Sequence, residues 1–340
     1  MQQLFQSRAA GPFGRRVLHE RGARIPVAVV TGFLGAGKTT LVKHFLESAE
    51  GHGTAIVVNE FGAAGIDDAL LRTSADETVL LGNGCLCCNV RSDLQVALRR
   101  LITDRERGLV PHFKRIVIET SGLADPGPIL RTFATDRALG GECHVDSVIA
   151  VADAVNGLST LDQFPEARQQ AMLADTIVVS KTDIATAEAS SALTARLRSL
   201  NPRAEIVTAA AGRVDPAIFT VSRNHPAFLA ETVGEAVHSD GITSFSLSFA
   251  EPLPWAVVAR AMDTLLALRG SDILRAKGLL AVEGCTGPVV VQFVQHLAHP
   301  PAELQAWPDD DHTGRLVFIT RGIAERDVRA LFEAVGRLHP

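Results

Sequence analysis

Short apolar runs alternate with stretches of helical spacing over residues 25–211. Apolar runs rich in Val and Ile are typical of strands that are buried on both faces of a parallel sheet. The runs predicted as strands are 26–30, 54–58, 78–81, 115–119, 146–151, 175–180 and 204–207. The stretches predicted as helices, where apolar residues recur every three or four positions, are 40–47, 92–102 and 189–200. Strands that alternate with helices predict an α/β fold with a mostly parallel sheet covered by helices on both faces.

A different pattern follows residues 212–241, where Gly, Pro, Asn and His accumulate and where we expect a linker. Beyond it, apolar and polar residues alternate over 243–249, as in a half-buried strand. Further strands are predicted at 276–283, 288–294 and 315–320, and helices at 254–269 and 324–335. The expected organisation is an α/β domain over 25–211, the linker, and a smaller α+β domain over 242–340.

The composition excludes several classes of protein. Of the 340 residues, 46% are hydrophobic and 21% are charged, as in a globular chain rather than a disordered one. The net charge of −5 provides no basic surface for nucleic acid. We see no uninterrupted apolar stretch of roughly 18 residues, so no membrane span is predicted. We also see no apolar core of a secretory signal near the N-terminus, and we expect a cytoplasmic protein.

Residues 1–24 have a composition of their own, with five arginines and a single acidic residue, Glu20. An arginine-rich, acid-poor segment is typical of an organellar transit peptide. A disordered tail, or a start of the chain placed too far upstream, would have the same composition. We expect this second interpretation, a disordered or mis-started tail.

The strongest chemical signal lies between the predicted strand at 26–30 and the predicted helix at 40–47. The sequence Gly-Phe-Leu-Gly-Ala-Gly-Lys-Thr at 32–39 matches the P-loop pattern G-x-x-x-x-G-K-[ST]. Glycines there let backbone N–H groups surround phosphate oxygens, and the following helix adds its N-terminal partial positive charge. We expect Lys38 to reach the β- and γ-phosphates and the Thr39 hydroxyl to ligate Mg²⁺. The residues expected to bind the nucleotide here are Gly32, Gly35, Ala36, Gly37, Lys38, Thr39 and Thr40.

A second nucleotide signal is Ser-Lys-Thr-Asp at 180–183, which resembles the guanine-reading pattern N-K-x-D of GTPases. A carboxylate at Asp183 can accept hydrogen bonds from guanine N1 and the exocyclic amine. Adenine lacks this donor pair, so Asp183 favours GTP over ATP. The apolar stem of Lys181 can lie along the base plane. Ser180 stands where most GTPases have Asn, and its shorter side chain predicts weaker affinity for the base.

A candidate sensor for the γ-phosphate follows the predicted strand at 115–119. Glu119 can hold Mg²⁺, directly or through water, or position the attacking water. The Gly122 amide can donate a hydrogen bond to the γ-phosphate. Hydrolysis would break that bond and release the segment 123–128. The residues expected to act in catalysis are therefore Lys38, Glu119 and Gly122.

Three cysteines, Cys85, Cys87 and Cys88, lie within four residues. A disulfide between the adjacent pair would be strained, whereas thiolates suit Zn²⁺ or Co²⁺. A structural zinc site usually has four ligands in two separated pairs, and this cluster has no second pair. An incomplete ligand set predicts an exchangeable site that carries a transition metal. We expect Cys143 and Cys285 to be structural.

Taken in order, these motifs resemble the CobW-like P-loop GTPases, a group of metallochaperones. The motifs that carry the resemblance are Gly-Phe-Leu-Gly-Ala-Gly-Lys-Thr-Thr (32–40), Asn-Glu-Phe-Gly (59–62), Gly-Cys-Leu-Cys-Cys (84–88), Glu-Thr-Ser-Gly-Leu-Ala-Asp-Pro (119–126) and Ser-Lys-Thr-Asp (180–183). The resemblance runs from about Ile25 to the C-terminus. It implies GTP hydrolysis to GDP coupled to delivery of a transition metal, zinc or cobalt, to a client protein. It also implies that Asn59 and Glu60 lie in the first switch, with Glu60 a further candidate ligand of Mg²⁺.

The chain departs from that family in two further ways. Ala63 and Ala64 follow Asn-Glu-Phe-Gly, where many relatives carry an acid just after the glycine, so a secondary metal site with that acid is not expected. Many relatives also carry a run of histidines, whereas the histidines of this chain are scattered, among them His225, His238, His296, His299 and His312.

Two alternative functions come from other classes. A P-loop small-molecule kinase would bind ATP and would not need Asp183 or clustered thiols. A non-enzymatic zinc-binding interaction module would tolerate Lys38→Ala. For a GTPase we expect slow basal turnover, since an arginine supplied by a partner can add roughly 10³–10⁵ in rate. The sequence leaves open the physiological metal, the client and the oligomeric state.

Overall fold

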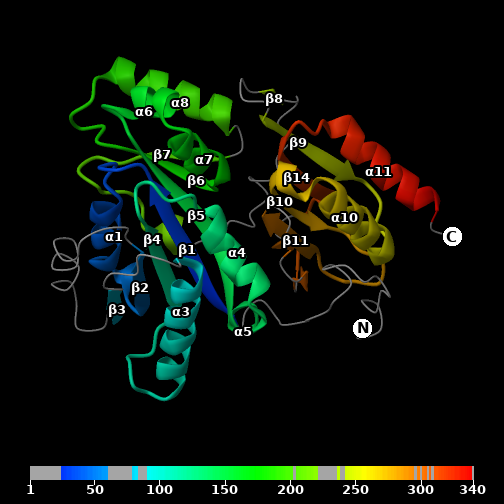
Figure 1. Cartoon of the computed structure of the whole chain (residues 1–340), viewed down its shortest axis with the longest axis horizontal. Coiled ribbons are helices and arrows are strands. Elements are labelled where there is room, and N and C mark those ends of the chain that lie inside the picture. The colour runs from blue at the N-terminus through cyan, green and yellow to red at the C-terminus, as the bar shows by residue number, and fades with distance from the viewer. Residues whose placement is uncertain are drawn as a thin grey trace. The chain divides into compact units, whose positions relative to one another are not determined.

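The computed structural model describes residues 24–59, 79–82, 90–201, 204–220, 236–237, 242–294, 297–298, 301–304, 306–307 and 310–338. They form two compact units (Figure 1). The described residues of Ile25–Thr132 and Glu142–Arg223 make the first unit. Those of Phe133–Gly141 and Asn224–Pro340, together with Arg24, make the second. The prediction of a disordered or mis-started tail falls, apart from Arg24, outside the described residues.

The first unit is built on a seven-stranded sheet in which all neighbouring strands are parallel. The strands follow the order β3-β2-β4-β1-β5-β6-β7. Their bounds are β1 Ile25–Gly32, β2 Thr54–Asn59, β3 Val79–Gly82, β4 Arg115–Thr120, β5 Cys143–Asp153, β6 Thr176–Ser180 and β7 Glu205–Thr208. In the central strand β1, the side chains of Val27, Val29 and Val30 expose no surface. Neighbouring elements therefore cover this strand on both faces. The predicted parallel α/β sheet is therefore confirmed.

Helices cover both faces of this sheet (Figure 1). On one face, α1 (Lys38–Leu46) and α9 (Ala217–Thr220) pack through the stacked rings of Phe45 and Phe219, 4.1 Å apart. On the other face, α6 (Gly157–Gln163), α7 (Pro165–Leu173) and α8 (Ala187–Leu200) form a core of Ala and Leu side chains. Thr186 caps α8 by accepting a hydrogen bond from the Ala189 amide, and Pro165 occupies the first turn of α7.

Several elements were not predicted. The remaining helices of this part of the chain are α3 (Val90–Glu106), α4 (Gly127–Thr135) and α5 (Arg137–Glu142). The predicted helix at 92–102 corresponds to α3. No helix was predicted at the positions of α4, α5, α6 and α7. Each of these four helices has nine residues or fewer, which is about two and a half turns at most. So few turns show too little apolar periodicity to be recognised.

The strand register brings the carboxyl ends of four strands to one edge. Glu119 near the end of β4 is level with Val30 of β1, and Gly32 at the end of β1 is level with Val151 of β5. Asp153 at the end of β5 is level with Ser180 at the end of β6. Ligands of open α/β sheets bind at this edge.

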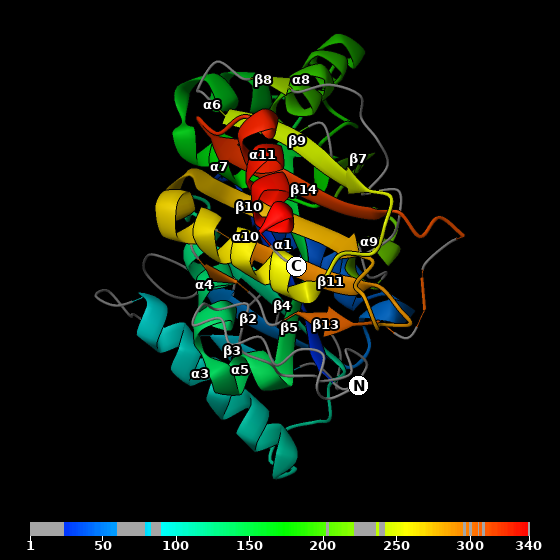
Figure 2. The same cartoon turned by 90° about the vertical axis from the view of Figure 1, so that its right-hand side faces the viewer.

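The second unit contains an antiparallel sheet in the order β12-β11-β10-β14-β9-β8, with β13 paired to β11. Its strands are β8 Ala236–Val237, β9 Ile242–Phe249, β10 Ile273–Leu280, β11 Val289–Val294, β12 Leu297–Ala298, β13 Ala302–Glu303 and β14 Gly314–Arg321. Helices α10 (Trp255–Arg269) and α11 (Glu325–Arg337) pack over it (Figure 2). The stacked rings of Phe245 and Phe318, 5.3 Å apart, lie in the core beneath them. The smaller α+β fold expected for this part is confirmed.

The interval 212–241, predicted as a linker, begins with ordered structure. It contains α9, whose Ile218 and Phe219 are buried in the core of the first unit. In the described parts of the chain, no helix combines the length and the apolar character that crossing a membrane requires.

Candidate nucleotide-binding site

The P-loop joins the end of β1 to the start of α1. At Gly32, φ is 139°, and a Cβ there would lie 2.3 Å from the Val151 carbonyl oxygen, so a side chain is sterically excluded. Gly37 caps α1 with φ 95° and makes no side-chain capping bond. The N–H groups of the first turn of α1 therefore point toward the loop without a capping side chain, as an anion site requires.

Lys38 is largely buried and folds back over the P-loop. Its Nζ donates to the carbonyl oxygens of Gly32 at 3.0 Å and Phe33 at 3.2 Å. An ammonium group held against carbonyl groups in a partly shielded loop is a strong local positive charge. An anionic phosphate entering the loop would therefore meet a cation that is already in place.

Thr39 and Glu119, far apart in sequence, meet beside the P-loop. Thr39 Oγ1 donates to Glu119 Oε1 at 2.6 Å, and the carboxylate is almost fully buried at the end of β4. A hydroxyl and a carboxylate are the hard oxygen ligands that Mg²⁺ prefers, so this donor set fits the ion. The third candidate ligand, Glu60, lies outside the described residues, and so does the side chain of Asn59.

Ser180 lies at the end of β6 and is almost fully buried. Its hydroxyl donates to the Ala36 carbonyl oxygen at 2.7 Å. The sequence led us to expect contact between Ser180 and the base. In the structure, its hydroxyl joins the predicted base-reading segment to the P-loop.

Lys181 follows in the left-handed region, with φ 59°, and its Nζ lies 2.8 Å from Asp153 Oδ2. Partial burial acts to raise the pKa of Asp153. Hydrogen bonds from Lys181, from the Val155 amide and from Asn156, together with the Lys181 charge, outweigh it and lower that pKa below its ordinary value. Asp153 was not among the predicted site residues, although a carboxylate at a strand's carboxyl end is a signal that the sequence contains.

Asp183 is exposed, and its Oδ1 accepts a hydrogen bond from the Ala211 amide at 2.9 Å. The same loop reaches the P-loop helix, because a Cβ at Gly212 would lie 2.6 Å from Thr40 Cγ2. The predicted base-reading residue and the predicted phosphate-binding helix are therefore connected through residues 211–212. Sequence reasoning did not identify this loop.

Gly122, the predicted γ-phosphate sensor, lies directly against the P-loop. A Cβ at this position would be 2.6 Å from the Leu34 backbone nitrogen. The backbone of the segment after β4 can approach the loop this closely only because residue 122 is a glycine. A change in the position of the P-loop at Leu34 would therefore act directly on the Gly122 backbone.

The thiol predictions divide into two groups. Cys85, Cys87 and Cys88 lie outside the described residues. Cys143 is buried in β5. Burial and the neighbouring Glu303 carboxylate raise the pKa of the Cys285 thiol to about 11, so this thiol stays protonated at neutral pH. A protonated thiol is a poor metal ligand, in keeping with the structural role expected of Cys285.

Comparisons with known proteins identify relatives of both units. Residues 26–208 match the CobW/HypB/UreG nucleotide-binding domain, and residues 242–336 match the cobalamin synthesis protein cobW C-terminal domain. The chain is 35% identical over 314 residues to the zinc chaperone YjiA of Escherichia coli, covering 91% of this chain and 98% of that protein.

Two further relatives extend this result. The chain is 35% identical over 198 residues to the zinc-regulated GTPase metalloprotein activator 1 of Schizosaccharomyces pombe, covering 56% of this chain and 47% of that protein. The crystal structure of Zn(II)-bound YjiA GTPase from E. coli is similar with a TM-score of 0.67 at 30% identity, over 92% of this chain and 99% of that one. Since the nucleotide-binding match spans more than half of its length, the chain belongs to the CobW/HypB/UreG family and carries a cobW C-terminal domain.

Proposed function

We propose that this chain is a GTP-hydrolysing metallochaperone, which binds a transition metal at Cys85, Cys87 and Cys88 and transfers it to a client protein. The observation that carries the proposal is the meeting of the Thr39 hydroxyl with the Glu119 carboxylate at 2.6 Å beside the P-loop, in a member of this family. Zinc is the favoured cargo, because a similar protein is named a zinc chaperone and a similar GTPase has a Zn(II)-bound crystal structure. Cobalt remains the alternative cargo.

The P-loop binds the GTP phosphates. Backbone amides of the loop and of the first turn of α1 surround the β-phosphate, and Lys38 approaches the β- and γ-phosphates. Asp183 accepts hydrogen bonds from guanine, with the stem of Lys181 beside the base. The position of Lys181 is supported by its ion pair with Asp153. The residues assigned to the nucleotide are Gly32, Gly35, Ala36, Gly37, Lys38, Thr39, Thr40, Ser180, Lys181 and Asp183.

Thr39 and Glu119, with Glu60, would hold Mg²⁺, which supplies charge neutralisation at the β- and γ-phosphates. The alternative role of Glu119 is to position the attacking water. The Gly122 amide donates to the γ-phosphate and follows its loss on hydrolysis. Turnover is slow in the isolated chain, because the acceleration of roughly 10³–10⁵ that an arginine can provide would come from a partner.

The nucleotide state controls metal affinity, because the cysteine cluster lies between two segments that respond to the nucleotide. The cysteine cluster lies in the sequence between the first switch, at Asn59 and Glu60, and the sensor, at 119–122. GTP orders both segments and assembles the thiolates, and hydrolysis loosens them so that the ion passes to the client. A cytoplasmic location would keep the thiols reduced for this role.

The test is a Zn²⁺ titration with a non-hydrolysable GTP analogue, with GDP and without nucleotide, using Cys87→Ser as the control for the site. Linkage requires metal and GTP affinities to change reciprocally, by about 5- to 150-fold for the usual coupling of about 1–3 kcal/mol. Equal zinc affinity in all three states would contradict the switch.

A second measurement separates the proposal from its alternatives. Lys38→Ala should reduce GTP hydrolysis by roughly 10²–10³, the usual effect of removing one group that stabilises transition-state charge. Arg329→Ala, which removes a cation paired with Glu325 on α11, is the matched control and should leave hydrolysis unchanged. Tighter binding of ATP than of GTP would favour the kinase, and normal activity of Lys38→Ala in cells would favour the zinc-binding module.

A further inference from the structure

One buried side chain outside the predicted site contacts the sensor segment directly. Gln170 on α7 has only 1% of its surface exposed. Its Nε2 donates to the carbonyl oxygens of Gly122 at 3.2 Å and Ala124 at 3.1 Å. Both hydrogens of the amide nitrogen are therefore used on backbone groups that lie 48 and 46 residues earlier in the chain.

The Gly122 backbone makes two close contacts. The backbone of Leu34 in the P-loop leaves no room for a Cβ at residue 122. The Gln170 amide donates to the Gly122 carbonyl oxygen. A backbone segment limited by these two contacts can present its N–H in a narrower range of directions. The direction of the Gly122 N–H decides whether it can donate to a γ-phosphate bound in the P-loop.

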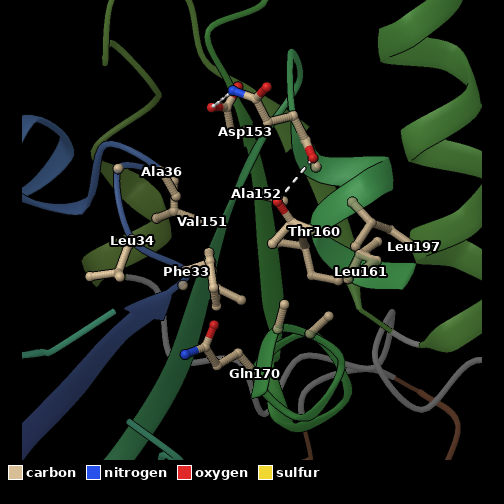
Figure 3. A pocket seen from close by; sticks show the side chains of 18 of the residues that line it. Phe33, Leu34, Ala36, Val151, Ala152, Asp153, Thr160, Leu161, Gln170 and Leu197 are labelled. Atoms are coloured by element: carbon tan, nitrogen blue, oxygen red, sulfur yellow. Dashed lines mark hydrogen bonds between the residues drawn. The ribbon is translucent and has the colours of Figure 1, made fainter. Parts of the chain in front are cut away.

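The other half of the Gln170 amide faces a cavity of about 230 Å³ behind the P-loop (Figure 3). Phe33, Leu161 and Leu197 line the same cavity. Gln170 Oε1 is buried there, with no hydrogen-bond partner among the described residues. Leaving Oε1 without a partner is a cost of burial, so the hydrogen bonds that favour this position of the amide are the two from Nε2 to the sensor carbonyl groups.

The helix that carries Gln170 leads to the base-reading segment. Only Ala174 and Asp175 separate the end of α7 from β6, the strand that ends at Ser180. The Ser180 hydroxyl in turn donates to the carbonyl oxygen of Ala36 in the P-loop. Contacts therefore run from the sensor segment to α7, along the chain to β6, from β6 to the P-loop, and from the P-loop back to the sensor segment.

We propose that Gln170 is a positioning residue for GTP hydrolysis, which holds the Gly122–Ala124 backbone so that the Gly122 amide can engage the γ-phosphate. This inference rests on the proposed role of Gly122 as the sensor. In this role Gln170 acts through the two carbonyl groups that it contacts and not through a contact of its own with the nucleotide. Its loss therefore affects the distinction between GTP and GDP more than the binding of either.

The chain offers a matched pair of variants on one helix. Gln170→Leu removes both donors, and the adjoining cavity accommodates the branched side chain. Gln169→Leu makes the same chemical change one position earlier, at a half-buried residue on the same helix. The measurements are kcat and KM for GTP, together with the ratio of affinities for a non-hydrolysable GTP analogue and for GDP.

For Gln170→Leu we expect kcat to fall about tenfold, which corresponds to roughly 1.4 kcal/mol of transition-state stabilisation. KM for GTP should stay within about twofold, and the analogue-to-GDP affinity ratio should also fall about tenfold. Gln169→Leu should match the wild type in all three quantities. If Gln170→Leu is poorly folded, Gln170→Met, an unbranched side chain of similar length, carries the same expectation.

A second variant tests whether the two hydrogen bonds donated by Gln170 are needed, with the affinity ratio for the analogue and GDP measured alongside activity. In Gln170→Glu, an ionised carboxylate would face the two carbonyl oxygens and repel them, whereas the protonated form could donate one hydrogen bond. Activity of this variant relative to the wild type should therefore rise as the pH falls toward the carboxyl pKa. A flat ratio across pH would contradict the proposal.

Two outcomes would overturn the inference and are distinguishable from failure of the proposed function. If Lys38→Ala loses hydrolysis but Gln170→Leu behaves like Gln169→Leu, the positioning role fails while the GTPase assignment stands. If Gln170→Leu only lowers the melting temperature and leaves the affinity ratio unchanged, the residue is structural. Normal hydrolysis by Lys38→Ala would overturn the GTPase assignment and the inference together.

Discussion

The two sheets each contain seven strands among the described residues, but their strand ends are arranged differently. In the parallel sheet, the P-loop, Glu119, Asp153 and Ser180 all lie at or beside the carboxyl ends of neighbouring strands. Buried polar residues also lie within strands of both sheets, for example Ser147 and Thr176 in the parallel sheet and Gln292 and Thr320 in the antiparallel sheet. Parallel strands all end at one edge, whereas antiparallel strand ends alternate between edges. Strand direction therefore explains why the nucleotide site belongs to the first unit.

The largest expected effect tests whether the second unit contributes stability rather than nucleotide chemistry. Phe318 is fully buried and stacks on Phe245 beneath α10 and α11. Phe318→Ala should lower the free energy of unfolding of that unit by about 3–5 kcal/mol, because it leaves a cavity in a packed core. Calorimetry should show the loss, while kcat for GTP at a temperature below both transitions stays unchanged. A loss of kcat in the same variant would show that the second unit also contributes to nucleotide chemistry.

The next effect concerns base recognition at the edge of the parallel sheet. Asp183→Asn should weaken GTP binding by about 1.5–3 kcal/mol, since bonds to a charged acceptor are lost. Affinity for xanthosine triphosphate should rise, because its C2 carbonyl can accept from the new amide. Competition binding with GTP, ATP and xanthosine triphosphate measures both changes. Asp311→Asn, at an exposed carboxylate of the second unit, is the control and should leave all three affinities unchanged.

A smaller effect tests whether the Ser180 hydroxyl joins its segment to the P-loop or reads the base. Ser180→Ala removes the hydrogen bond to the Ala36 carbonyl oxygen, which is worth about 0.5–1.5 kcal/mol. GTP and GDP affinities should fall by the same factor, roughly 2- to 10-fold, and the preference for GTP over ATP should not change. A selective loss of GTP over ATP in isothermal titration would instead show that Ser180 reads the base.

The smallest effect is the pH dependence of the pair between Asp153 and Lys181. The folded-state pKa of Asp153 lies below its ordinary value, so the pair stabilises the fold above the unfolded pKa of about 3.9 and is lost as the pH falls through the lower folded pKa. Asp153→Asn should reduce the free energy of unfolding at pH 7 by less than about 1 kcal/mol. Denaturant titrations should show this deficit at pH 7 and none below the folded pKa. A deficit that persists at low pH would point to packing instead of charge.

Much of the fold could be predicted because it follows from local patterns. The strands at 26–30 and 115–119 are apolar enough that only a doubly covered sheet can bury them. The short helices α4 to α7 could not be recognised, because too few turns were available to show a period. For the site, the P-loop could be read from spacing alone. Asp153 follows a predicted strand, and that signal was not used, whereas Gln170 was missed because an isolated Gln has no distinguishing neighbours in sequence.

The sequence by itself determined which chemistry is available: a loop that can surround phosphates, a carboxylate suited to guanine, and three clustered thiols. Only the tertiary structure decided which of these groups meet. Thr39 and Glu119 are 80 residues apart, Gln170 and Gly122 are 48 apart, and Ser180 and Ala36 are 144 apart. Spacing and periodicity report local backbone conformation and burial. Contacts across such separations depend on the order and register of the strands, which form only when the parallel sheet is assembled.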